Sequence, residues 1–132
     1  MPQTMATEIQ KQCETIEECY EFALSFAARG LAGDEGSQLR EQLTRAVAAM
    51  RGLKQSCAEA IGDGLPAPTE KYEAFFAVLK RDAESALAAM ELVLVQPTIG
   101  SQLIDNLNAS IHLRALLADL FLVTEILAAR QK

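Results

Sequence analysis

The single histidine, His112, is the side chain in this sequence with the widest choice of chemistry. An imidazole can bind a metal ion, act as a general base or accept a phosphoryl group. On a helix, His112 would share an approximate face with Asp105, Asn108 and Asp119. These residues spread over several turns, whereas metal ligands must converge on one point. The spacing therefore favours a solvated polar stripe, and we predict no metal or other cofactor.

Two weaker hypotheses also involve His112. The segment "NASIHLRALLADL" could present a phosphate-accepting histidine, but it lacks the His-x-Leu-Lys-Gly context of phosphotransfer bundles. Asn106, Ser110 and His112 leave open a small-molecule or metal site inside a bundle or an oligomer channel. Neither hypothesis supplies a complete set of catalytic groups, so we predict that the protein is not an enzyme.

The three cysteines offer little further chemistry. Cys13 and Cys57 fall on apolar helical stripes, and Cys19 lies off the stripe without an identified base. An odd number of cysteines without a Cys-x-x-Cys pair predicts reduced thiols in an intracellular protein.

Charged residues form two clusters. Glu14, Glu17, Glu18 and Glu21 have helical spacing, and a solvated acidic face is the ordinary explanation for them. Possible nucleic-acid-binding residues lie along one helix as a local positive strip: Arg40, Arg45, Arg51 and Lys54. No aromatic residues interleave with this strip to stack on bases, and the net charge of −6 disfavours binding to phosphate. A strip that is solvated, or salt-bridged to a Glu-rich neighbouring subunit, is the preferred interpretation, with nucleic-acid binding as the alternative.

Length and composition limit the class of protein. The 132 residues fit one domain over residues 1–132, with 50% hydrophobic but only 5% aromatic residues. Such an apolar mass favours closely packed helices. The N-terminal segment lacks the pattern of a signal peptide, and charges interrupt every candidate membrane span, so we expect a cytoplasmic protein without membrane contact.

Glycine and proline divide the chain into four helical segments. The breaks fall at residues 29–36, 62–69 and 96–100, and Thr7, Asp34, Thr69 and Thr98 are possible helix starts. Three segments carry apolar residues at steps of four and three: Ile9, Cys13, Ile16, Tyr20, Ala23, Ala27 and Gly30; Leu39, Leu43, Ala46, Met50, Leu53, Cys57 and Ala60; Tyr72, Phe76, Leu79, Ala83, Ala86, Met90 and Val93. Short links between them predict an all-α, up-down-up-down antiparallel four-helix bundle.

The last segment has more apolar residues than one buried face needs. We expect one helix from Thr98 to Arg130, about 50 Å long. Its stripe runs through Ile99, Leu103, Asn106, Ser110, Leu113, Leu117, Leu120, Thr124 and Leu127. Five further apolar residues lie off this stripe: Leu116, Phe121, Leu122, Val123 and Ile126. We predict that they form an oligomer interface, most simply with another copy of the chain. A bent helix or the N-terminal arm could instead cover them.

The segment "SQLREQLTRAVAAM" and the following helix "KYEAFFAVLKRDAESALAAMELV" resemble the S23-like four-helix-bundle family. This family includes proteins encoded by intervening sequences of 23S ribosomal RNA genes and accessory proteins of diversity-generating retroelements. The shared features are Leu39, Gln42, Leu43, Arg45 and Ala46, and the resemblance covers about Glu17 to Arg130. It implies a closed homo-oligomer, plausibly a pentamer, without implying catalysis. The sequence thus predicts a non-enzymatic assembly or adaptor module whose partner is itself or another protein.

Overall fold

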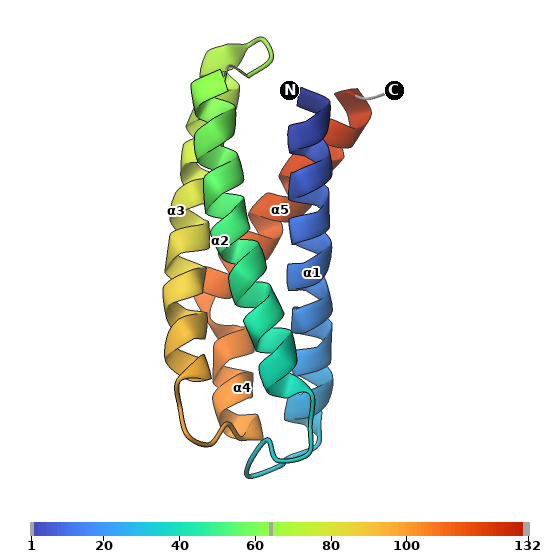
Figure 1. The fold of residues 1–132 in the computed structure, drawn as a ribbon, viewed down its shortest axis with the longest axis vertical. Coiled ribbons are helices and arrows are strands. Elements are labelled where there is room, and N and C mark those ends of the chain that lie inside the picture. The colour runs from blue at the N-terminus through green and yellow to red at the C-terminus, as the bar shows by residue number, and fades with distance from the viewer. Residues whose placement is uncertain (1, 64, 131–132) are drawn as a thin grey trace.

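The computed structural model describes residues 2–63 and 65–130, with side chains described for residues 6–62 and 65–129. These residues form five helices (Figure 1): α1 (Pro2–Ala28), α2 (Leu39–Asp63), α3 (Thr69–Leu94), α4 (Ser101–Ala109) and α5 (Ile111–Arg130). Within the described ranges there is no strand, so the prediction of an all-helical chain is confirmed.

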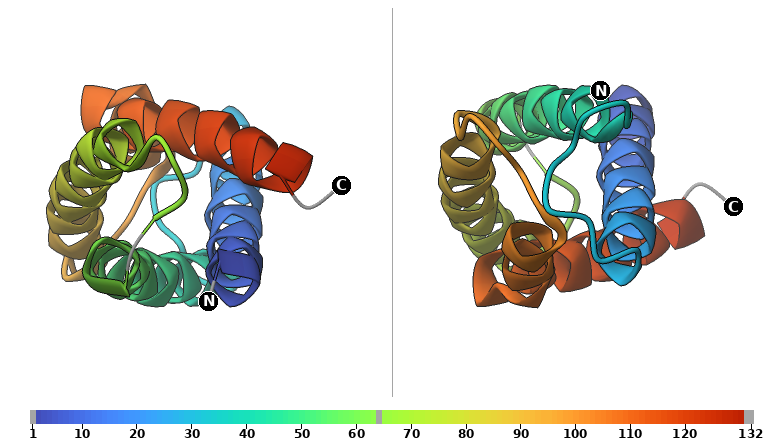
Figure 2. Two further views of the ribbon diagram at one scale, coloured as in Figure 1. Left: turned by 90° about the horizontal axis from the view of Figure 1, so that it is seen from above. Right: turned by 90° about the horizontal axis from the view of Figure 1, so that it is seen from below.

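The helices surround a common core. Successive long helices run in opposite directions along the molecule, and α4 and α5 together form the fourth side (Figures 1 and 2). α1 and α3 lie on opposite sides, and no Cα of one lies within 8 Å of a Cα of the other. Both contact α2, α4 and α5. Seen from above, α5 runs diagonally along one side, from α3 past α1 (Figure 2).

The core contains the apolar stripes that the sequence indicates. In α2 the whole predicted series is buried, and in α3 only Tyr72 of the predicted series is partly exposed. In α1, Ile9, Cys13, Ile16 and Ala23 are buried, whereas Gly30 is exposed beyond the end of the helix. Each large aliphatic side chain removed from water contributes about 1.5–3 kcal/mol, so these stripes hold the helices together.

The prediction of a single helix from Thr98 to Arg130 is wrong, because this segment forms two helices, α4 and α5. Ser110 adopts an extended conformation (φ −60°, ψ 131°) between α4 and α5. Its side-chain oxygen accepts a hydrogen bond from the N–H of His112 at 3.3 Å. Serine and asparagine side chains compete with the helical backbone and favour helix ends, which explains a break at this place.

The break also changes which residues of the segment are buried. In α4 the buried residues are Ser101, Ile104, Leu107 and Asn108, whereas Asn106 of the predicted stripe is exposed. The asparagine on the inside is therefore Asn108.

Three predicted helix starts are also corrected. α1 begins before Thr7, at Pro2. α2 begins at Leu39, whose N–H donates to the Ser37 hydroxyl at 3.2 Å, rather than at Asp34. α4 begins at Ser101 instead of Thr98, with Gly100 as its N-cap residue. Thr69 is the first residue of α3, as expected for a helix start near this position.

Two loops meet at the lower end of the molecule in Figure 1, where the segments before α2 and before α4 lie together. The N–H of Ser101 donates to the carbonyl oxygen of Leu31 at 2.7 Å, and the Ser101 hydroxyl accepts from the N–H of Leu31 at 2.7 Å. A Cβ on Gly100 would lie 2.7 Å from the carbonyl oxygen of Ala32. Glycine is therefore what allows this close approach of the two backbones.

Candidate interaction surface

The outward face of α5 carries exposed apolar side chains. Phe121, Leu122 and Ile126 are 48%, 51% and 38% exposed, respectively. Leu122 and Ile126 point away from the buried residues Leu113, Leu120 and Leu127, which the sequence assigned to the core, and Phe121 lies on the flank of the helix. These three side chains are thus available to a partner.

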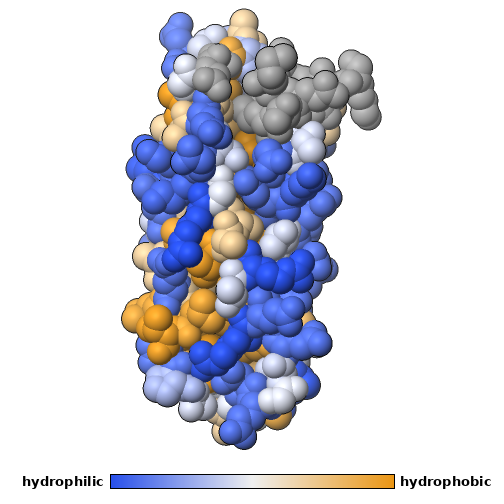
Figure 3. All heavy atoms as spheres, viewed as in Figure 1, coloured by the Kyte–Doolittle hydropathy of each residue, from blue (hydrophilic) through white to orange (hydrophobic). Residues whose placement is uncertain are grey.

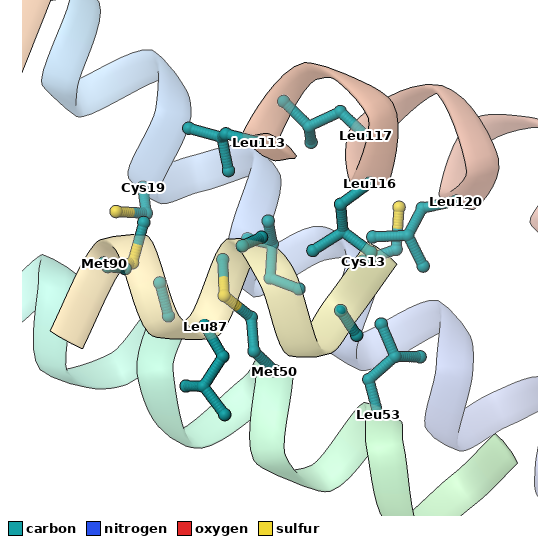
Figure 4. Packing of buried hydrophobic residues seen from close by; sticks show 14 of the residues in the cluster. Cys13, Cys19, Met50, Leu53, Leu87, Met90, Leu113, Leu116, Leu117 and Leu120 are labelled. Carbon is teal, nitrogen blue, oxygen red and sulfur yellow. The ribbon is translucent and has the colours of Figure 1, made fainter. Parts of the chain in front are cut away.

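Two of the five predicted interface residues are not available. Leu116 is fully buried and Val123 is 2% exposed. Figure 4 shows Leu116 and Leu120 pointing from α5 into the space between the helices. The predicted stripe was too narrow, because the diagonal course of α5 lets it pack against both α1 and α3. A helix covered on two sides needs a wider apolar face, and Leu116 and Val123 belong to that face.

The sequence reasoning also missed Ile111, which is 74% exposed at the first position of α5. Ala118 and Ala129 are exposed farther along the same outward face, and Ala115 is half-buried there. A second series with steps of four and three runs through the closing segment and could have revealed these residues.

Exposed apolar side chains occur elsewhere, but they are more scattered. Figure 3 shows the face carrying α1 and α2, where hydrophilic residues dominate and a hydrophobic patch lies over the lower end of α3. Leu92 and Val95, at the end of α3, are 65% and 73% exposed, and Leu24 of α1 is 47% exposed. The face of α5 differs from these sites because its apolar residues recur at helical spacing along the whole helix.

Arg40, at the start of the predicted basic strip, is a structural clamp. Its Nε lies 2.6 Å from Oδ2 of Asp34, and its terminal nitrogens donate to three backbone carbonyls, those of Leu94, Gln96 and Pro97. Oδ1 of Asp34 accepts from the N–H of Ile99 at 3.0 Å. Burial opposes ionisation of Asp34, but the hydrogen bonds from Ile99 and Arg40 outweigh it and hold the pKa below its usual value.

Two of the other basic residues also have acidic neighbours from α3. Arg51 pairs with Glu91, and Nζ of Lys54 lies 3.6 Å from Glu84. Arg45 is exposed, and no ion pair to it occurs within the described residues. The strip is thus largely neutralised by acidic residues of the same chain, whereas the sequence analysis expected solvent or a neighbouring subunit to do so.

The three cysteines are buried and have no disulfide partner among the described residues. Cys19 is 2% exposed, so it belongs to the core although the sequence placed it off the stripe. Burial raises the pKa of Cys13 to about 11 and that of Cys19 and Cys57 to about 12. At neutral pH all three are thiols, and a thiol is a poor nucleophile.

The polar row around His112 does not converge. His112 and Asp105 are exposed, whereas Asn108 is 5% exposed and its amide has no hydrogen-bond partner within the described residues. The structure brings together no group of three potential metal-binding His, Cys, Asp or Glu residues in the part of the chain that it describes. The acidic cluster of α1 is mainly exposed, as expected for a solvated face.

Asp119 lies instead beside a second carboxyl, that of Asp82 on α3. Burial, together with the hydrogen bond and the negative charge of Asp82, raises the pKa of Asp119 to about 7. Two neighbouring carboxylates cannot both ionise easily, so the pair retains a proton near neutral pH. The flank of α5 that carries Asp119 therefore faces α3.

Comparison with known proteins gives no relative to add to this picture. No family model, curated protein or solved structure matches the chain. Among the helices described here, none combines the length and apolar character needed to cross a membrane.

Proposed function

We propose that this protein is a non-enzymatic, cytoplasmic assembly or adaptor module that associates with itself. In this proposal an up-down-up-down four-helix bundle is the subunit, and the outward face of α5 is the contact surface. The observation that carries the proposal is the exposure of Phe121, Leu122 and Ile126 on one face of α5. Water-exposed apolar surface of this continuity is typical of protein–protein contacts.

A second copy of the chain is the simplest partner, because soluble oligomers are usually built from identical subunits. The resemblance of the segments Ser37–Met50 and Lys71–Val93 to the S23-like family also supports self-association, and it implies five subunits. Nucleic-acid binding is not proposed, since the net charge is −6 and three of the four candidate basic residues have acidic neighbours.

Light scattering over a concentration series tests the proposal. We expect the native chain to have a mass well above 14.3 kDa, and a Phe121→Glu, Ile126→Glu variant to have the mass of one chain. Two charges placed in an apolar contact leave unpaired ions in the interface, which costs several kcal/mol.

Leu24→Glu is the matched control, because Leu24 is similarly exposed but lies on α1. This variant should keep the native mass, and circular dichroism should show that all variants remain helical. A native chain with the mass of a monomer at every concentration would refute the proposed function.

A further inference from the structure

The outward face of α5 has the spacing of a helix-pairing seam. Its apolar residues follow one another at steps of four or three: Ile111, Ala115, Ala118, Leu122, Ile126 and Ala129. We call this set the outer seam of α5. All except the half-buried Ala115 are exposed, and Phe121 lies beside the seam. Such spacing allows side chains of one helix to enter the gaps of another.

If two α5 helices pair antiparallel, the large residues of one outer seam lie opposite the small residues of the other. Around the level of Leu120, Ala118 lies as far toward one end of the helix as Leu122 lies toward the other. Ile111 and Ala129 are related in the same way. In an antiparallel pair centred at this level, each large residue would face a small one from the partner.

The charges beside the seam are complementary in the same register. Arg114 and Glu125 are both exposed, and they lie on the flank of α5 opposite the one where Asp119 faces α3. Neither has an ion-pair partner within the described residues. A two-fold axis perpendicular to the helices brings equivalent flanks together. Arg114 of one copy would then lie within about one helical rise, about 1.5 Å along the axis, of Glu125 of the other.

We propose that two copies of this chain pair through the outer seams of α5, antiparallel and about a two-fold axis at the level of Leu120. The proposal rests on the proposed function, because it assumes self-association through this face. It adds the partner's orientation, its register and the residues that select it. A two-fold pair is closed, so the outer seam predicts two subunits in contact rather than the ring of five that the family resemblance implies.

Charge reversal tests the register. Arg114→Glu alone and Glu125→Arg alone each place two like-charged pairs across the two-fold axis, and we expect each to raise the dissociation constant at least about tenfold at low salt. A mixture of the two variants restores both opposite-charge pairs. Native mass spectrometry of the mixture should therefore show mainly the mixed dimer, and the chain carrying both changes should regain native affinity.

Arg81→Glu is the matched control, because Arg81 is exposed but lies on α3. Mixed with Glu125→Arg, it should show no preference for the mixed dimer. Cysteine cross-linking tests the direction of pairing: Ile111→Cys mixed with Ala129→Cys should give a disulfide-linked dimer, whereas Ile111→Cys alone should not.

The outcomes separate the two proposals. A monomeric native chain would overturn both. In the other case, the native chain is a multimer that Phe121→Glu, Ile126→Glu dissociates. Any one of three results would then overturn the antiparallel pair alone: five subunits, no preference for the mixed dimer, or cross-linking of Ile111→Cys to itself.

Discussion

At the scale of single residues, two side chains of the same type have different roles because their surroundings differ. Arg40 and Arg45 are one and a half turns apart on α2, and the sequence treated them alike. Arg40 donates to Asp34 and to three carbonyl groups at the end of α3 and in the segment that follows it, whereas Arg45 is exposed. A guanidinium group presents five donors in a fixed plane, which suits a site with several acceptors. Arg40 therefore holds two loops together.

Replacing Arg40 tests this role. We expect Arg40→Ala to lower the free energy of unfolding by about 1–3 kcal/mol, because it leaves Asp34 and the carbonyl groups without their donor. Arg45→Ala should change it by less than about 0.5 kcal/mol. Urea denaturation of both variants measures the difference, and equal effects would contradict a clamp at Arg40.

The carboxyl pair of Asp82 and Asp119 makes stability depend on pH. The pKa of Asp119 rises from 3.8 in the unfolded chain to about 7, so the folded protein retains a proton in this window that the unfolded chain has released. Because the folded state binds more protons, this group lowers the free energy of unfolding as pH rises from about 4 to about 7.

Asp119→Asn should remove that slope and stabilise the protein at pH 8 by about 1 kcal/mol, a value reduced for the partial exposure of the site. Thermal unfolding between pH 4 and pH 8 measures it. Asp105→Asn removes an exposed carboxylate from α4 and should change stability by less than about 0.5 kcal/mol. A loss of stability in Asp119→Asn at pH 8 would show that the charged carboxylate is favoured instead.

At the scale of elements, α5 has two apolar faces with different roles. The inner face packs against α1 and α3, and the outer seam faces away from them. The break at Ser110 contributes to this arrangement, because it frees α5 from the direction of α4 (Figure 2).

One substitution on each face distinguishes the roles. Leu116→Ala should lower the free energy of unfolding of the subunit by about 2–5 kcal/mol, since it opens a cavity in the core. Leu122→Ala should leave subunit stability nearly unchanged and weaken association. Both variants are denatured in the Phe121→Glu, Ile126→Glu background, where no association is expected. The free energy of unfolding measured there is that of the single subunit. A similar loss for both residues there would contradict the division into two faces.

At the scale of the whole molecule, the sequence predicts the parts that depend on regular spacing. The stripes of α2 and α3 repeat without interruption, and burial follows them almost residue by residue. The last segment is different, because Leu116 and Val123 acquire their burial from the path of α5 between α1 and α3. No pattern within one helix specifies that path. For the same reason, the predicted set of surplus apolar residues combined buried side chains, Leu116 and Val123, with exposed ones.

The loop contacts were beyond prediction for a related reason. The contacts of Arg40 with the segment before α4, and of Ser101 with Leu31, join residues more than fifty positions apart. Such contacts depend on where the helices end in space, and the sequence gives only approximate helix ends.

The diagonal course of α5 has a mechanical consequence. No Cα of α1 lies within 8 Å of a Cα of α3, and both helices contact α5, so α5 resists a lengthwise displacement of one relative to the other. A fourth helix parallel to α1 and α3 could slide along with either of them. A diagonal helix must instead lose its contacts with one of them when they slide. α5 thus limits the movement of α1 and α3 relative to each other. A partner bound to the outer seam would contact the same helix that limits this movement.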